Sequence, residues 1–391
     1  APLIINSKRI LYLRQNTTTT IMSGYSVEQE RFLAIVPKIT GALGFPSALF
    51  ILSEVLYSHR RQDGNPILRA IAFVSFFEGL DAMAWFLSTW AVPRGTFAFA
   101  TGNQATCDFQ GFFLQFVIGG PMHNCALALY FFLAARHGQT AYQLAKVERV
   151  VNIVVFFYAL ATSLILLALE QYNPIGAVCW VIGSPGGCSD SLFNGVGGDH
   201  SDFVPCDRGE NAWFYGMILF YTPLWCCIVV ILCLNLRIYS HIRDTGEASW
   251  FATQSILYAV AFCITWAPST TWSAIHYRGE ASFVLDFLSG LFEPLASFWN
   301  LLIFIRSRPS SRKRLHALLT LQWGDLWSIN DNETSSSSSS NPARQKTSSV
   351  TRPSHEEHHH GGESNGENPN TEENTESPEL FASEGEQPDA T

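Results

Sequence analysis

Long apolar runs alternate with short polar stretches through most of the chain. Seven of these runs are long enough for a helix that crosses a bilayer, which needs about 20 residues. They are apolar on nearly every side, as expected of helices that face lipid. The pattern therefore predicts an all-α membrane protein built as a seven-transmembrane helix bundle. The runs cover residues 32–57, 67–90, 109–134, 150–169, 212–236, 251–273 and 282–305.

Composition supports a membrane protein over a soluble one. Only 15% of the 391 residues are charged and 47% are hydrophobic, whereas about 25% of a typical soluble protein is charged. The bilayer is therefore the first predicted partner, and the predicted location is multi-pass in the plasma membrane.

Basic residues distinguish the two sides of the predicted bundle. Thirteen Lys and Arg residues lie in or beside the loops on one side, and three lie on the other. Because short cytoplasmic loops retain positive charge, the first side is predicted to be cytoplasmic, with the N-terminus outside. The thirteen are Arg60, Arg61, Arg69, Arg136, Lys146, Arg149, Arg237, Arg243, Arg306, Arg308, Arg312, Lys313 and Arg314, and the three are Arg94, Arg208 and Arg278.

The ends of the chain differ from the bundle, which we place at residues 31–308. Residues 1–30 are predicted to be a short extracellular segment; Met22 is an alternative start, so 1–21 need not be translated. Residues 309–328 are predicted to form an amphipathic helix on the membrane surface, with cations first and an apolar face after them. Residues 329–391 are rich in Ser, Glu, Asn and Gly, which predicts a disordered cytoplasmic tail. The tract HEEHHH at 355–360 is interpreted as solvated and not as a metal site.

Polar side chains inside the predicted spans are costly in lipid and mark sites or buried pairs. Lys38 and Asp286 lie at similar depth on neighbouring helices, so one hypothesis pairs them. In the alternative, Lys38 reaches the interface and Asp286 faces a water-filled cavity. The acids of the second and seventh helices predict a polar core, either a switch or ion site or a satisfied hydrogen-bond network. The polar positions singled out are Lys38, Glu78, Asp81, Asn124, Asp286, Glu293 and Asn300.

Trp266 and Pro268 lie in the sixth run, in the stretch TWAPSTTW. Proline inside a helix removes one backbone hydrogen bond and kinks the helix. This pair therefore predicts either a hinge for a moving helix end or a static kink.

Four cysteines fall on the predicted outer side. Cys107 heads the third helix, and Cys179, Cys188 and Cys206 share the second outer loop. An oxidising compartment favours disulfides over zinc or cytosolic redox chemistry. Four cysteines allow three pairings, among which spacing does not choose.

Four stretches carry a resemblance to a known family: AWFLSTWAVPRG, TCDFQGFFLQF, QYNPIGAVCWV and PLASFWNLLIFIRSR. With them the chain resembles the seven-helix G-protein-coupled receptors over about residues 27–310. It is nearest to the cyclic-AMP-receptor-like and secretin-like branch, and similar to orphan receptors of that type in microalgae. It departs from other branches in lacking an Asp-Arg-Tyr triplet after the third helix and an Asn-Pro-x-x-Tyr motif in the seventh. Its N-terminus is also too short for the disulfide-rich hormone-binding domain of secretin receptors.

The resemblance implies pairing of Cys107 with Cys179, which leaves Cys188 for Cys206. It implies a receptor that passes an extracellular signal from an unknown ligand to a heterotrimeric G protein by helix rearrangement. The G protein is expected to dock around Arg136, Arg237 and Arg243. Serines 335–340 in the tail are expected either to recruit a kinase or arrestin-like partner or to stay unmodified.

Other seven-helix proteins fit less well. A retinal protein needs a lysine in its seventh helix, and 282–305 has none; a zinc hydrolase needs more histidines than His123. No nucleotide-binding or nucleophile motif is present, so we predict no enzymatic activity, no metal and no cofactor. The alternative is a transporter or channel with a polar pathway through Asp81, Asp286 and Glu293, and a receptor that binds without signalling also stays open.

Overall fold

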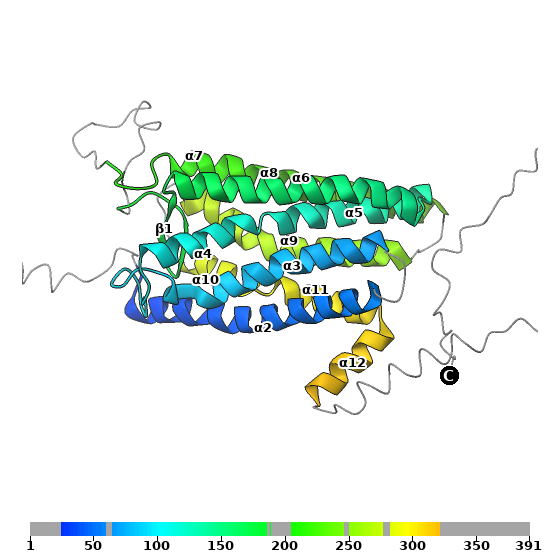
Figure 1. Cartoon of the computed structure of the whole chain (residues 1–391), viewed down its shortest axis with the longest axis horizontal. Coiled ribbons are helices and arrows are strands. Elements are labelled where there is room, and N and C mark those ends of the chain that lie inside the picture. The colour runs from blue at the N-terminus through cyan, green and yellow to red at the C-terminus, as the bar shows by residue number, and fades with distance from the viewer. Residues whose placement is uncertain are drawn as a thin grey trace, which may run out of the picture. The chain divides into compact units, whose positions relative to one another are not determined.

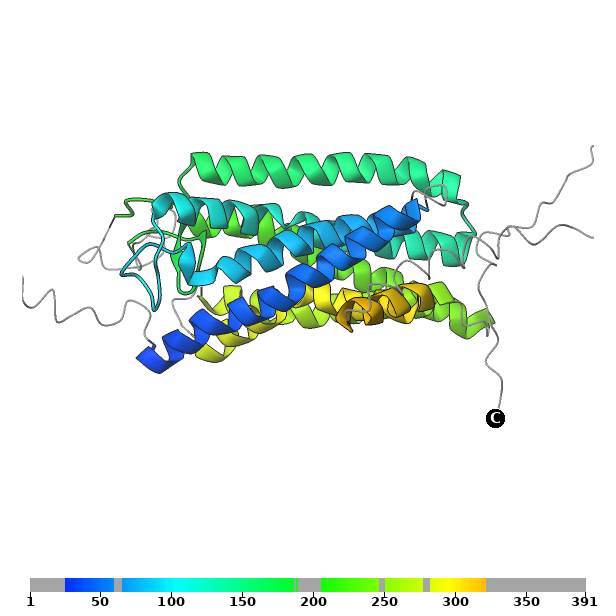
Figure 2. The ribbon, with the colours of Figure 1, turned by 60° about the horizontal axis from the view of Figure 1, so that its bottom comes forward.

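A computed structural model describes residues 25–59, 65–185, 188, 205–245, 250–276 and 282–320. Each of the seven apolar runs is helical, either as one helix or as a broken pair, and these helices run side by side (Figure 1 and Figure 2). The helices are α2 (Val27–His59), α3 (Pro66–Leu87), α4 (Gln104–Phe116), α5 (Gly119–His137), α6 (Ala141–Ala168), α7 (Ala212–Gly216), α8 (Thr222–Thr245), α9 (Trp250–His276), α10 (Phe283–Phe292) and α11 (Ala296–Arg306).

Glycine and proline explain where three of these helical paths break. Gly119, Gly120 and Pro121 open α5 just after the break from α4. A π-helical turn, η3 (Met217–Tyr221), precedes Pro223 in α8. The path bends by 41° between α10 and α11, at Pro294, whose ring cannot continue the hydrogen-bond ladder. Pro268 instead stays inside the continuous helix α9.

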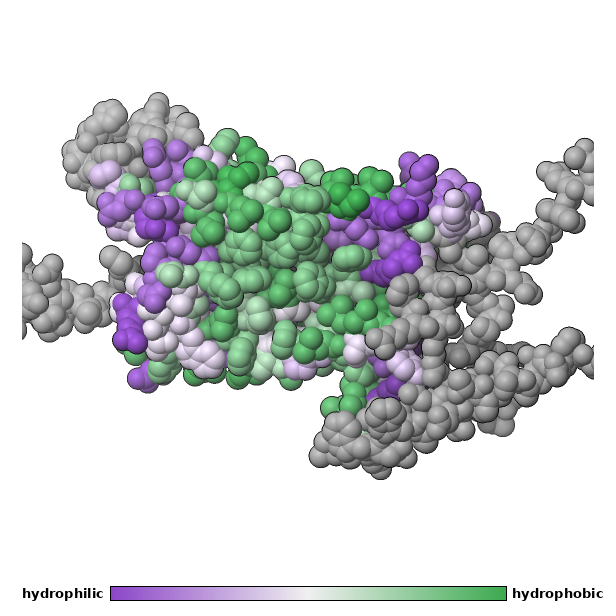
Figure 3. All heavy atoms as spheres, viewed as in Figure 1, coloured by the Kyte–Doolittle hydropathy of each residue, from purple (hydrophilic) through white to green (hydrophobic). Residues whose placement is uncertain are grey.

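The number of spanning helices differs from the prediction. Among the described helices, five are long and apolar enough to cross a membrane, or six if α10 and α11 form one bent span. Helix α9 has 27 residues but is not among the five. The helices fit a multi-pass membrane protein, and on the face in Figure 3 a hydrophobic band lies between two polar rims. The seven-span count and the orientation stay predictions.

A β-hairpin, which the all-α prediction missed, joins α6 to the second half of the bundle. Strands β1 (Tyr172–Ile175) and β2 (Val178–Val181) pair antiparallel, with Tyr172 opposite Val181. Gly176 forms the turn at a φ of 71°, which glycine adopts without steric cost. The four residues of β2 are buried, so the hairpin is part of the core. We call the end of the bundle that carries it the hairpin end.

Close helix approach fixes the packing beneath the hairpin. Helix α5 contacts α3, α6, α8 and α9, and α2 packs on α3, α10 and α11. Gly44 of α2 lies against the bend between α10 and α11: a Cβ there would come within 2.0 Å of the Pro294 carbonyl oxygen. Small residues permit such close helix contacts.

The predicted surface helix corresponds to α12 (Pro309–Leu319). It is shorter than the predicted 309–328, and residues 321–328 lie outside the described residues. The predicted tail at 329–391, with its serines and HEEHHH tract, and residues 1–21 also lie outside them.

Candidate functional site

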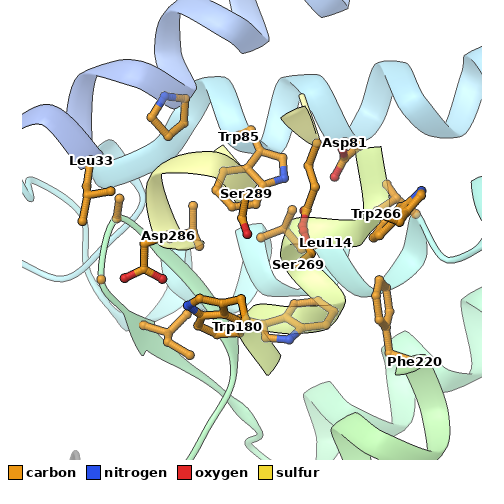
Figure 4. A pocket seen from close by; sticks show the side chains of 18 of the residues that line it. Leu33, Asp81, Trp85, Leu114, Trp180, Phe220, Trp266, Ser269, Asp286 and Ser289 are labelled. Atoms are coloured by element: carbon orange, nitrogen blue, oxygen red, sulfur yellow. The ribbon is translucent and has the colours of Figure 1, made fainter. Parts of the chain in front are cut away.

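A cavity of about 90 Å³ lies at the hairpin end, between the hairpin and helices α2, α3, α4, α9 and α10 (Figure 4). One water molecule needs about 10–15 Å³ of such space. The cavity therefore has room for several waters or for part of a small organic molecule.

Strand β2 forms one wall of the cavity and is bonded to α4. Cys107 of α4 is joined to Cys179 of β2, and both are fully buried. One turn further along α4, Gln110 Oε1 accepts a hydrogen bond from the Cys179 backbone N–H (2.9 Å), while its Nε2 donates to the Ala84 carbonyl (2.9 Å). A second disulfide joins Cys188 to Cys206. These are the pairings that the resemblance implied.

Arg208 supports the hairpin from the side, a role that the sequence did not indicate. Its guanidinium pairs with Asp108 of α4 (3.0 Å) and with Glu170 (3.3 Å). Its Nε also donates to Asn173 Oδ1 of β1 (3.2 Å). In the sequence, Arg208 stands alone in a loop that contains several acids, and this pattern does not indicate which acids it pairs with.

Three of the acids singled out in the sequence meet in this cavity: Asp81 of α3, Asp286 of α10 and Glu293 at the end of α10. None of the described residues that line it is Lys, Arg or His. Asp81 and Glu293 are 5% and 9% exposed. The indole N–H of Trp85 lies beside both carboxylates but stands outside hydrogen-bonding geometry.

Asp286, in contrast, has partners. The Tyr25 hydroxyl donates to its Oδ2 (2.5 Å), and the Trp272 indole also donates to it. Burial raises the pKa of the Tyr25 hydroxyl above its usual value, and the hydrogen bond to Asp286 raises it further. The hydroxyl therefore keeps its proton and remains a donor.

The predicted pair between Lys38 and Asp286 is not formed. Lys38 Nζ donates to Thr89 Oγ1 (2.7 Å) and to the Ala34 carbonyl oxygen (2.9 Å). It also lies 5.2 Å from the ring centre of Trp90. Similar depth placed the two residues at one level, but the rotation of α2 turns Lys38 toward the end of α3 and away from the cavity.

Aromatic rings connect the hairpin to α9. Trp180 of β2 packs edge-on against Phe220 of η3, with ring centres 4.9 Å apart. Phe220 lies 5.9 Å from Trp266 of α9, and Trp266 lies 6.4 Å from Phe262. The predicted hinge pair, Trp266 and Pro268, therefore stands at the end of a continuous contact path from the cavity wall.

A polar cluster lies deeper in the bundle. Glu78 of α3 accepts hydrogen bonds from Asn300 of α11 (2.6 Å) and from Asn124 of α5 (3.3 Å). A small void of about 10 Å³ lies among these three residues and is also lined by Trp266. We call Glu78, Asn124 and Asn300 the acid–amide cluster; it ties three helices together directly below the cavity.

The end of the bundle opposite the hairpin carries Arg136, Arg237 and Arg243. All three are exposed, Arg136 near the end of α5 and the other two in the last turns of α8. Sequence reasoning missed a contact near this end, where Arg69 of α3 binds both carboxylate oxygens of Glu148 of α6 (2.7 and 2.5 Å). In the sequence, Glu148 is an acid among basic residues in AKVERV, and this pattern does not indicate that Arg69 is its partner.

Comparison with models of known protein families and with curated proteins finds no match to this chain. The function is therefore argued from the site itself.

Proposed function

We propose that the chain is a G-protein-coupled receptor with seven spanning helices, with the hairpin end outside and Arg136, Arg237 and Arg243 facing the cytoplasm. The observation that carries the proposal is the contact path from the cavity to α9. A ligand in the cavity would touch Trp180 and Trp266, and Trp266 lies two residues before a proline inside its helix.

The path suggests how a ligand could act. A ligand shifts a conformational equilibrium only through its different affinity for the two states. Contact with Trp266 favours one position of its ring, and Pro268, with its missing hydrogen bond, lets the rest of α9 follow. The acid–amide cluster lies beside Trp266, so a shift there changes the packing of α3, α5 and α11 together.

The opposite end offers a surface for a G protein. The exposed Arg136, Arg237 and Arg243 provide positive charge on α5 and α8. These helices pack on each other, and both contact α9, so a movement of α9 changes the surface that they present. The serines at 335–340 are proposed as sites for a kinase, and then for an arrestin-like partner.

Dissociation of a heterotrimeric G protein, measured by energy transfer in cells that express the full chain, tests this function. We expect dissociation without ligand or with one member of a ligand panel. It should be lost when Arg136, Arg237 and Arg243 are replaced by Ala together. Arg94→Ala, an exposed arginine at the hairpin end, is the matched control and should leave the signal unchanged. Absence of dissociation with every G protein and ligand, at normal surface expression, would reject the proposal.

A transporter or channel is the second candidate, because the voids lie in series. The cavity shares Trp266 with the void at the acid–amide cluster, and that void shares Asn124 and Phe262 with a further one beside Tyr258. Bent helices and buried acids are also found on ion pathways. Flux of protons or sodium through the full chain in liposomes, abolished by Asp81→Asn, would favour this candidate over the receptor.

A further inference from the structure

The cavity at the hairpin end combines negative charge with aromatic surface. Two of its three carboxylates, Asp81 and Glu293, are more than nine-tenths buried. The one described donor beside both is the Trp85 indole N–H, which stands outside hydrogen-bonding geometry. Burying a carboxylate with so few donors is costly, and a positive charge beside it offsets part of that cost. No described residue of the lining supplies this charge.

Lys38, the basic side chain nearest in sequence to the lining residue Pro37, does not supply it either. Its ammonium group already has partners: it donates to the Ala34 carbonyl oxygen and to Thr89 Oγ1, and it lies over the ring of Trp90. Neither Thr89 nor Trp90 lines the cavity. A molecule that carries a positive charge into the cavity would supply what the described lining lacks.

The aromatic part of the lining narrows the class of that molecule. Four tryptophans, together with Phe220 and Tyr221, face the same space; they are Trp85, Trp180, Trp266 and Trp272. Tryptophan is the best aromatic partner for an organic cation, and desolvated contacts of this kind bind quaternary and protonated amines. A metal ion fits less well, because no group of three or more His, Cys, Asp or Glu side chains among the described residues is placed to hold one. An anion would meet three acidic side chains and no basic group in the described lining.

We infer that the cavity binds a small organic cation, a protonated or quaternary amine, whose charge lies between Asp81 and Glu293 and whose apolar part contacts Trp180 and Trp266. Asp286, held by Tyr25 and Trp272, adds negative potential nearer the hairpin. The inference shares one premise with the proposed function, that the cavity is the ligand site. The choice of an amine follows from the residues that line the cavity.

Calorimetric titration of the purified full chain in lipid nanodiscs tests the inference. The probes are phenethylammonium and tetramethylammonium, with phenethyl alcohol and phenylacetate as neutral and anionic counterparts of the first. We expect at least one amine to bind the unaltered protein, and the alcohol and the carboxylate to bind at least about tenfold more weakly, the penalty expected for losing a buried charge contact.

Variants locate the binding. Glu293→Gln and Asp81→Asn keep the shape of the side chain and remove its charge, and each should weaken amine binding at least about tenfold. Glu28→Gln is the matched control, because Glu28 is an exposed acid of α2 that pairs with Arg31 of the same helix, and it should leave the affinity unchanged. If a charge-removing variant does not fold, the comparison of amine with alcohol on the unaltered protein still decides.

The inference is overturned if neither amine binds, if phenethyl alcohol binds as tightly as phenethylammonium, or if both cavity variants bind the amine like the unaltered protein. Its failure is separable from failure of the receptor proposal, because calorimetry involves no G protein. Amine binding without any G-protein dissociation rejects only the receptor. G-protein dissociation that depends on Arg136, Arg237 and Arg243, with no amine binding, rejects only the cation site.

Discussion

Two acids one turn apart on α3 have opposite surroundings. Both oxygens of Glu78 accept hydrogen bonds from asparagines, whereas Asp81 faces the cavity without a partner of good geometry. A satisfied buried polar group holds its neighbours in place, and an unsatisfied one is available to a ligand. Glu78 therefore belongs to the framework, and Asp81 to the proposed cation site.

Replacing Asn300 by Leu should destabilise the protein, because Glu78 Oε2 would lose its donor (2.6 Å) while staying buried. We expect a loss of about 1–3 kcal/mol, measured as a lower midpoint of thermal unfolding in detergent. Asn235→Leu is the control, because Asn235 Nδ2 donates to the Ile231 carbonyl of its own helix (2.9 Å) and links no other described helix. Equal losses in the two variants would show that the acid–amide cluster has no special role.

At the scale of elements, long-range contacts attach each span to its neighbours. The hairpin is attached by a disulfide, by Gln110 and by Arg208, and α3 is attached to α6 by Arg69 and Glu148. Apolar helices in lipid gain little from hydrophobic contact with each other, so such polar and covalent contacts set the arrangement.

The disulfides should differ in importance. The Cys107–Cys179 bond spans 72 residues and is buried against Val92 and Phe97, whereas the Cys188–Cys206 bond spans 18. Crosslinks that close longer loops stabilise more, and the first also fixes a wall of the cavity. Cys107→Ser should therefore reduce surface expression, measured by antibody labelling of intact cells, far more than Cys188→Ser does. Similar surface levels for the two variants would contradict this ranking.

Arg69→Lys should loosen the contact between α3 and α6. The guanidinium makes two parallel hydrogen bonds to Glu148, whose side chain is 3% exposed, and an ammonium cannot reproduce this geometry. Because Arg69 is 29% exposed, we expect a modest loss of about 1–2 kcal/mol in thermal unfolding. Arg149→Lys serves as control, since among the described residues Arg149 donates to a backbone carbonyl of its own helix. An equally large loss of stability in that variant would show that the Arg69–Glu148 pair has no special role.

At the scale of the whole molecule, the topology depends on whether α9 crosses the membrane. Helix α9 is not among the five helices long and apolar enough to do so, and it carries the polar run Ser269–Ser273 (STTWS). Nevertheless it contacts α5, α8, α10 and α11 and supplies Trp266 to the cavity. A helix surrounded by other helices can carry hydroxyl groups that lipid would not tolerate, which explains how α9 could span without being apolar throughout.

Glycosylation mapping decides the topology. An Asn-X-Thr acceptor with a flexible spacer is inserted either at 246–249, before α9, or at 277–281, after it. If α9 spans and the hairpin end is outside, only the second insertion should be glycosylated, seen as a glycosidase-sensitive shift on gels. Modification of both sites or of neither would show that α9 does not cross.

Much of the helical framework could be predicted, because the hydropathy of a run and the effect of proline on the backbone depend on residues within a single helix. The hairpin could not: β1 and β2 have four residues each and lie in a loop that reads as Gly-rich and polar. Their pairing depends on Cys107 and Gln110, more than sixty residues earlier. The Lys38–Asp286 prediction was wrong because depth in the membrane is encoded along the chain, whereas the direction of a side chain depends on how its helix is rotated against others.

The sequence by itself determined that apolar helices recur along this chain and which rare acids and amides they carry. These properties follow from local hydropathy and local backbone chemistry. Only the tertiary structure decided that Asp81, Asp286 and Glu293 meet tryptophans in one cavity, while Glu78 is bound by Asn124 and Asn300. That division depends on contacts between helices far apart in sequence, which short-range patterns do not specify.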